Sequence, residues 1–162
     1  THRNAVRDVA LFSVLAATGI RPSEALSLRC SDLHLQSAKP WIRVVRLKKK
    51  KTVQEFTDLV IPRETALALR EHAATTRDGR LFPITRRQAE RLFHHYRRRA
   101  GLRKSYLYVL RHTAATRVYR ATRDIKVVQE MLGHEKPDTS SIYAHVPTAL
   151  MRELADRFTA VV

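Results

Sequence analysis

Apolar residues near the start of the chain recur every three or four positions, the spacing that gathers them on one face of a helix. This pattern predicts a helix over residues 4–17, stopped by the pair Thr18-Gly19, and a second helix from Pro22 to about Leu28. The same period predicts later helices over 62–74, 85–99, 107–118 and 124–133, and a last one from Pro147 onward. Most of the chain is therefore expected to be helical.

A different pattern follows Pro40. Residues 41–47 and 56–61 are rich in β-branched and aromatic side chains, and each segment predicts a strand. The lysine run of residues 48–51 then falls in the hairpin that joins them. We therefore expect an α+β fold, mostly α-helical with a small antiparallel β-sheet, in one domain that covers residues 1–162.

Four residues mark where the later helices begin and end. Thr85 with Gln88 is the pattern of a capping box, in which each side chain bonds the other residue's backbone N–H. Asp124 is suited to cap the start of a later helix, and Gly133 to end that helix.

Charge adds the first indication of function. The chain has 31 Lys and Arg against 15 Asp and Glu, a net charge of +16, and residues 86–123 hold twelve of the basic residues with Glu90 as the one acid. The electric field of such a charge favours binding to a polyanion. Nucleic acid is the first candidate partner, and an anionic membrane is the main alternative. The basic residues are spread over several predicted elements, which disfavours a membrane-surface helix. No segment has the length and apolar character of a membrane span, and no signal peptide is recognisable.

The motifs that the chain lacks narrow the chemistry. Its four glycines are far apart, so no phosphate-cradling loop is expected, and no His-Glu-x-x-His pair or acidic cluster for two metal ions is visible. The single Cys30 excludes an internal disulfide and a cysteine-based zinc site, and it fits a reducing, intracellular setting. Phosphate chemistry without a metal would have to rely on cationic side chains, arginine above all.

Three segments offer such side chains. In "ATGIRPSEALSLR", Arg21 stands between a helix stop and a new helix, where free backbone N–H groups could also face an anion. In "YVLRHTAATR", Tyr108 and Arg111 are three residues apart and share one helix face. In "LGHEKPDTSSIYAHV", His134 follows a helix stop and Tyr143 comes nine residues later. Each segment alone is compatible with an ordinary structural role.

Together, and in this order, the pieces "TGIRPSEALSL", "LRHTAATR", "MLGH" and "IYAHV" resemble the tyrosine recombinase (phage integrase) family. The resemblance includes the lysine-bearing hairpin and extends over most of residues 5–147. It implies the catalytic domain of a DNA breaking and rejoining enzyme, a site-specific recombinase or integrase that needs neither metal nor ATP nor another cofactor.

The resemblance also implies a role for each site residue. Arg21, Arg111 and His134 would bind the scissile phosphate, and Tyr143 would attack it to form a 3′-phosphotyrosine. A hairpin lysine would give the leaving 5′-oxygen its proton. Counting from the strand end favours Lys50, then Lys49, and the other lysines of the run, Lys48 and Lys51, would contact the DNA backbone.

Six further residues complete the expected site. Where the family usually has His or Lys, this chain has Tyr108, which is a poor proton acceptor. Two alternatives follow: water or a phosphate oxygen removes the proton from Tyr143, or Tyr108 only positions the phosphate. His112 is expected to be a buried, structural histidine, and Glu24 to have a minor role in orienting Arg21. The helix that Thr85 begins would bind DNA through three arginines, Arg86, Arg87 and Arg91.

The implied partner is double-stranded DNA with a specific recombination site, and no membrane. The resemblance also implies a homo-oligomer, a tetramer on DNA, formed through the C-terminal segment, in the bacterial cytoplasm at the nucleoid. The alternative for this segment is packing on the core of its own chain. The family's N-terminal core-binding domain is expected to be absent, so the chain is taken as a fragment. Two alternatives stay open: another tyrosine-dependent DNA breaker, such as a type IB topoisomerase or telomere resolvase, and a non-catalytic DNA-binding module.

Overall fold

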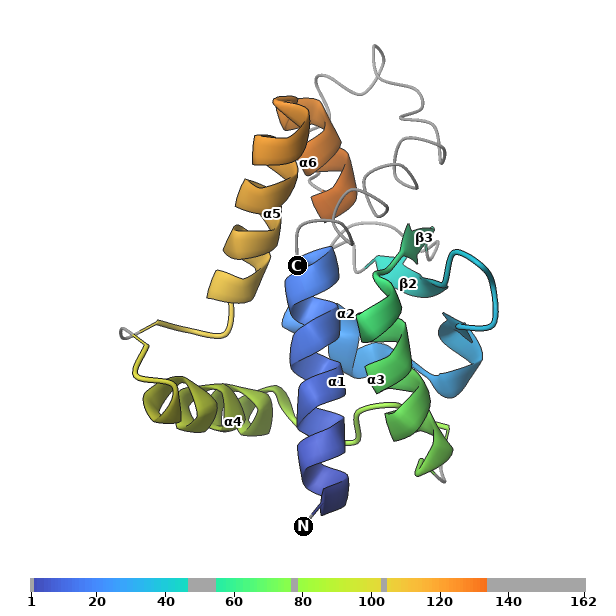
Figure 1. Cartoon of the computed structure of the whole chain (residues 1–162), viewed down its shortest axis with the longest axis vertical. Coiled ribbons are helices and arrows are strands. Elements are labelled where there is room, and N and C mark those ends of the chain that lie inside the picture. The colour runs from blue at the N-terminus through green and yellow to red at the C-terminus, as the bar shows by residue number, and fades with distance from the viewer. Residues whose placement is uncertain (1, 47–54, 77–78, 103–104, 134–162) are drawn as a thin grey trace.

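The computed structural model describes residues 2–46, 55–76, 79–102 and 105–133. These residues form an α+β fold of helices with one small antiparallel sheet, as the sequence predicts (Figure 1). In chain order the elements are α1 (His2–Thr18), α2 (Pro22–Ser27), η1 (Cys30–Asp32), β1 (Leu33–His34), β2 (Trp41–Arg46), β3 (Glu55–Val60), α3 (Arg63–Ala74), α4 (Arg86–Arg99), α5 (Val109–Thr122) and α6 (Ile125–Leu132).

Helix α1 is the element around which the others pack. Its residues Ala10, Leu11 and Val14 have no exposed surface, because the three-to-four spacing puts them on one face. In Figure 1, α3 lies alongside α1 while α4 crosses near its lower end, and α1 contacts α5 as well as α3. The predicted apolar face is thus the centre of the main hydrophobic core.

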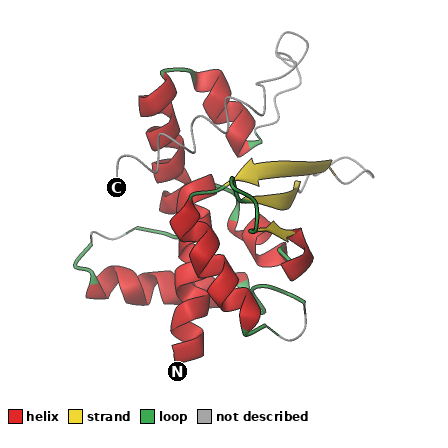
Figure 2. Cartoon of the chain, turned by 45° about the vertical axis from the view of Figure 1, so that its right-hand side comes forward, coloured by secondary structure: helices red, strands yellow, loops and turns green. Residues whose placement is uncertain are grey.

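The sheet lies at one side of the helices (Figure 2). Its strands run in the order β1-β2-β3, and β2 pairs with β3 from Trp41 opposite Val60 to Arg46 opposite Glu55. Side chains alternate along β2, so Ile42 and Val44 are buried against the core while Arg43 is exposed. Arg46 falls on the same inward side as the two apolar residues.

A second, smaller hydrophobic cluster joins α5 to α6. Its buried residues are Ala114, Val118, Val127, Val128, Met131 and Leu132. Gly19 touches this cluster from the end of α1: a Cβ atom placed there would lie 3.0 Å from both Ala114 Cβ and Leu132 Cδ2. The absence of a side chain at Gly19 therefore lets the end of α1 approach α5 and α6 closely.

The residues expected to begin and end the later helices do so in the structure. Thr85 accepts from the Gln88 backbone N–H at 3.2 Å and Gln88 Oε1 accepts from that of Thr85 at 2.7 Å. Asp124 Oδ1 accepts from the Lys126 N–H at 2.8 Å, and Gly133 ends α6 with a left-handed φ of 62°. β1 and η1 were not predicted, since elements of two or three residues carry no readable period.

Among the described residues, no helix combines the length and apolar character needed to cross a bilayer. The expected C-terminal helix from Pro147 lies outside the described residues, as does the lysine run of residues 48–51.

Gly19→Ala is expected to destabilise the protein more than Gly101→Ala. Both glycines have a left-handed φ, 64° and 66°, but a Cβ at Gly101 meets nothing within 4 Å. Both changes should cost about 1–2 kcal/mol for the backbone, and Gly19→Ala should cost roughly 1–3 kcal/mol more for overpacking. Urea unfolding followed by circular dichroism measures the difference. Equal free energies of unfolding for the two variants would show that the α1 end is not tightly packed.

Candidate active site

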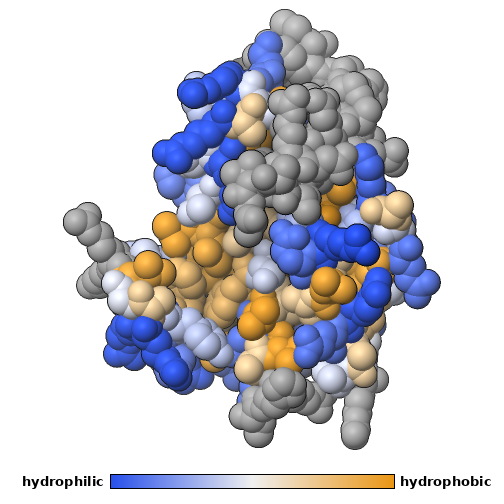
Figure 3. Space-filling model, in the orientation of Figure 1, coloured by the Kyte–Doolittle hydropathy of each residue, from blue (hydrophilic) through white to orange (hydrophobic). Residues whose placement is uncertain are grey.

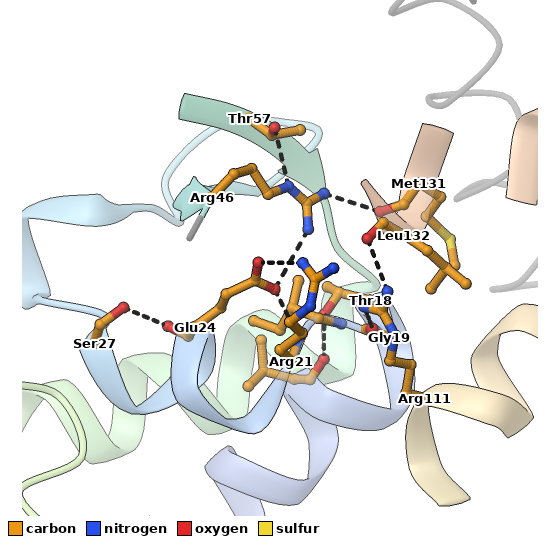
Figure 4. Close-up of polar contacts among 12 residues, drawn as sticks. Thr18, Gly19, Arg21, Glu24, Ser27, Arg46, Thr57, Arg111, Met131 and Leu132 are labelled. Carbon is orange, nitrogen blue, oxygen red and sulfur yellow. Dashed lines mark hydrogen bonds and ion pairs between the residues drawn. The ribbon is translucent and has the colours of Figure 1, made fainter. Parts of the chain in front are cut away.

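Arg111 on α5 is buried, and its guanidinium joins two other segments of the chain. Nη1 donates to the carbonyl oxygen of Gly19 at 2.6 Å, and Nη2 to that of Leu132 at 2.9 Å (Figure 4). Gly19 follows α1 and Leu132 is the last residue of α6, where carbonyl groups lack a partner within the helix. Arg111 therefore ties two helix ends together. Burial lowers its pKa, although an arginine stays charged at neutral pH.

Arg21 and Glu24 form the second part of the site, at the start of α2. Arg21 Nη1 lies 3.0 Å from Glu24 Oε1, and the Arg21 backbone N–H donates to Glu24 Oε2 at 2.7 Å. The expectation of free N–H groups at this helix start is thus wrong for Arg21, because Glu24 folds back as in a capping box and takes that donor. The Arg21 side chain is 34% exposed, so one side of it can meet a ligand.

The expected i,i+3 pairing of Glu24 with Arg21 is confirmed, but the role of Glu24 is larger than the minor one expected. Its carboxylate has no exposed surface, and it contacts a second arginine, Arg46, whose Nη1 lies 3.5 Å from Glu24 Oε2. A buried carboxylate is costly unless cations and hydrogen bonds answer its charge. Glu24 is therefore a structural centre of the site, and the i,i+3 spacing from Arg21 showed only one of its partners.

Arg46 is the residue that sequence reasoning missed. It is 7% exposed, and Nε donates to Thr57 Oγ1 at 3.1 Å while Nη2 donates to the Met131 carbonyl oxygen at 2.9 Å (Figure 4). The sequence does contain a signal for it. Arg46 occupies the third inward position of β2 after Ile42 and Val44, where an apolar residue would be expected.

We call Arg21, Glu24, Arg46 and Arg111 the arginine cluster. Three positive charges and one negative charge leave a net charge of +2 in a largely buried place. Burial lowers the pKa of Arg46, and Arg111 and Arg21 lower it further, against the effect of Glu24. Like charges held together in a low dielectric attract an anion strongly. The arginine cluster is thus suited to bind a phosphate group.

Tyr108, at the start of α5, and Arg111 face the same side of this helix, as their spacing predicts. The Arg111 Cζ lies 5.9 Å from the centre of the Tyr108 ring, at the outer limit of a cation–π contact, and Tyr108 is half exposed. His112, by contrast, is exposed, so the expectation of a buried structural histidine is wrong. It follows Arg111 directly and is turned about 100° away from that buried position on the helix.

Arg86, Arg87 and Arg91 on α4 are exposed, and no described contact tests their role in DNA binding. Helix α4 itself is held to α1, since Tyr96 donates to Asp8 Oδ2 at 3.0 Å. Burial raises the pKa of Tyr96, and Asp8 raises it further. Figure 3 shows hydrophilic surface over α4 and over α5, with an apolar stretch between them.

Several predicted site residues lie outside the described residues: Lys48, Lys49, Lys50, Lys51, His134 and Tyr143. Of the predicted catalytic residues, the structure places Arg21, Tyr108 and Arg111. Within the described ranges, no three His, Cys, Asp or Glu side chains gather as metal ligands would.

The model of the phage integrase family matches residues 1–149, so the chain belongs to this family. Tyrosine recombinase XerH of Campylobacter jejuni is 30% identical over 153 residues, which cover 88% of this chain and 42% of the relative. Tyrosine recombinase XerD of Oceanobacillus iheyensis is 31% identical over 166 residues, 92% of this chain and 53% of the relative. The chain thus spans about half the length of the curated relatives it matches.

Solved structures show the same fold. A crystal structure of XerA recombinase superimposes with a TM-score of 0.67 at 31% identity, over 96% of this chain and 59% of that one. The structure of XerH site-specific recombinase bound to difH substrate, a pre-cleavage complex, gives a TM-score of 0.71 at 25% identity, over 93% of this chain and 46% of that one. The predicted family and fold class are therefore confirmed.

Arg111→Lys is expected to lower the free energy of unfolding by about 1–3 kcal/mol, because lysine cannot donate to both carbonyl groups and leaves a buried acceptor unpaired. Arg117 offers a matched control: it also lies on α5 and donates to a carbonyl of α1, that of Ala16, but it is exposed. Arg117→Lys should change stability by no more than about 0.5 kcal/mol. Urea unfolding of both variants checks this, and equal effects would contradict the bracing role of Arg111.

Proposed function

We propose that this chain is the catalytic domain of a site-specific DNA recombinase or integrase, which cleaves and rejoins DNA strands through a 3′-phosphotyrosyl intermediate. The observation that supports this most strongly is the convergence of Arg21 and Arg111 on one net-positive cluster, from segments far apart in sequence. Membership of the phage integrase family supports the same function, and the relatives that this chain matches are named tyrosine recombinases.

The proposed reaction conserves the phosphodiester bond energy. Tyr143 loses its phenolic proton to water or to a phosphate oxygen, its oxygen forms a bond to the scissile phosphorus, and the bond from phosphorus to the 5′-oxygen breaks. The leaving 5′-oxygen takes a proton, which we assign to Lys50. A 5′-hydroxyl of another strand then attacks the phosphotyrosine and restores the DNA backbone and the free tyrosine. Bond formation and cleavage balance in each half, so no ATP is consumed.

The proposed role of the arginines follows from where charge develops. The phosphoryl transition state gathers negative charge on the non-bridging oxygens, and preorganised donors there are each worth roughly 3 kcal/mol. Arg21 is partly exposed and can contact the phosphate with the N–H groups that Glu24 leaves free. Arg111 spends one donor each on Gly19 and Leu132, and a guanidinium has five N–H groups, so three remain for a ligand or water. We assign to His134 a further hydrogen bond to the same phosphate and to Tyr108 a positioning role.

The proposed partner is double-stranded DNA that carries a specific recombination site. The net charge of +16 and the exposed arginines Arg86, Arg87 and Arg91 support DNA binding. Among the solved relatives, XerH site-specific recombinase is bound to its difH substrate. We further propose that the chain assembles as a tetramer on DNA through its C-terminal segment and works at the bacterial nucleoid.

Tyr143→Phe is expected to abolish covalent attachment to DNA, since a phenyl ring has no nucleophilic oxygen. The measurement uses nicked suicide DNA with a candidate site, and counts protein–DNA complexes that survive denaturation. Tyr119→Phe is the control, because Tyr119 is exposed on α5 and has no assigned role. Equal yields from native protein and Tyr143→Phe would refute the assignment. Relaxation of supercoiled plasmid without any specific site would favour a topoisomerase instead.

Lys50→Ala is expected to slow cleavage by roughly 10²–10⁴-fold, the usual contribution of a general acid, and Lys49→Ala by much less. A substrate with sulfur in place of the 5′-bridging oxygen needs no protonation, because a thiolate is a good leaving group. This substrate should restore cleavage by Lys50→Ala. If Lys49→Ala is the slow variant and is the one restored, Lys49 is the general acid and our choice is wrong.

A further inference from the structure

Arg46 is the one buried side chain of the arginine cluster that comes from the sheet. It joins three elements: β3 through Thr57, α2 through Glu24 and the end of α6 through the Met131 carbonyl. Figure 4 shows its guanidinium between these partners, on the far side of Glu24 from α1. Each of the three Arg46 nitrogens thus donates to one of the segments that support the site.

The position of Arg46 also depends on Gly133. A Cβ atom at Gly133 would lie 3.2 Å from both Cζ and Nε of Arg46, tighter than ordinary contacts. Glycine at this point lets the guanidinium lie against the end of α6 without being displaced, and the left-handed φ of 62° at Gly133 also favours glycine. The chain therefore provides a dedicated place for this cation beside the carbonyl groups of α6.

The carboxylate of Glu24 explains why a cation is needed there. Glu24 is fully buried, and Arg21 and Arg46 are the arginines that pair with it. If Arg21 alone answered the charge of Glu24, the two would form a neutral pair and Arg21 would present little net charge to an anion. With Arg46 also present, the same carboxylate is shared and a net positive charge remains at Arg21.

We propose that Arg46 is a positioning residue for the phosphate site, whose charge offsets Glu24 so that Arg21 keeps its own charge for the DNA phosphate. This inference rests on the proposed function only for the identity of the anion. Arg46 itself is not a catalytic residue, because it acts through Glu24 and Arg21. A role in packing alone is the competing explanation.

A double-mutant cycle separates charge from packing. The measurement is the rate of covalent complex formation at saturating nicked suicide DNA, for Arg46→Met in the native protein and in the Glu24→Gln background. If Arg46 offsets Glu24, Arg46→Met should slow cleavage by roughly tenfold or more in the native protein and by less than about threefold in the Glu24→Gln background. Equal losses in both backgrounds, or no loss in either, would overturn the proposal.

Arg46→Lys loses the planar group that reaches both Thr57 and Met131, but it keeps the positive charge. Because the proposed role depends on charge, this variant should slow cleavage by less than about threefold. This variant decides the question if Arg46→Met does not fold, as judged by circular dichroism. A loss of about tenfold or more for Arg46→Lys at saturating DNA would show that bracing geometry, and not charge, is what Arg46 supplies. Arg43→Met is the control from the same strand, because Arg43 pairs with Asp58 at the exposed surface.

A second readout does not depend on catalysis. Inorganic sulfate serves as the probe, and the shift of the thermal midpoint with sulfate concentration reports anion binding. Arg46→Met should show a smaller shift than Arg43→Met, and this difference should largely disappear in the Glu24→Gln background. If the native protein forms no covalent complex while the sulfate pattern holds, the proposed function fails and the role of Arg46 stands. If covalent complexes form but Arg46→Met changes neither the sulfate-dependent shift of the thermal midpoint nor the cleavage rate, the proposed role of Arg46 is wrong while the proposed function stands.

Discussion

The burial of the Glu24 carboxylate is the constraint on which the site depends. A charged group with no exposed surface must be surrounded by donors, and here they come from the Arg21 backbone and side chain and from Arg46. Satisfying this one group brings the start of α2 and the end of β2 together. Arg46 in turn reaches α6, and Arg111 joins α6 to the end of α1. The anion site is thus a consequence of meeting the needs of a buried anion.

The carbonyl groups at the end of α6 are the second half of this arrangement. Met131 and Leu132 each present a carbonyl oxygen that the helix leaves without an internal partner, and each accepts from a buried arginine. Helix C-termini carry partial negative charge, so cations are favoured there. Two arginines can therefore be buried near each other without a second carboxylate, and the net positive charge is retained for a ligand.

Much of the fold could be predicted from the sequence, because it rests on local patterns. The helices and the β2–β3 pair follow from apolar spacing, and the caps at Thr85 and Asp124 from the hydrogen bonds of single side chains. The resemblance of four short segments to one family identified Arg21 and Arg111. The pairing of Glu24 with Arg21 was predicted, but its contact with Arg46 and the contact of Arg46 with Met131 were missed, because these partners lie 22 and 85 residues apart in the chain. His112 was misjudged because its identity did not reveal which side of α5 it occupies.

The proposed role of the arginine cluster is to offset the negative charge of a scissile phosphate. The most direct test compares native protein and Arg21→Ala on two suicide substrates, one with an ordinary scissile phosphate and one with a neutral methylphosphonate in its place. On phosphate, Arg21→Ala should cleave roughly 10²–10³-fold more slowly than native protein. On methylphosphonate, which has no charge to offset, the two proteins should differ by less than about tenfold. An equal loss of rate on both substrates would show that Arg21 does not act by offsetting the charge of the phosphate.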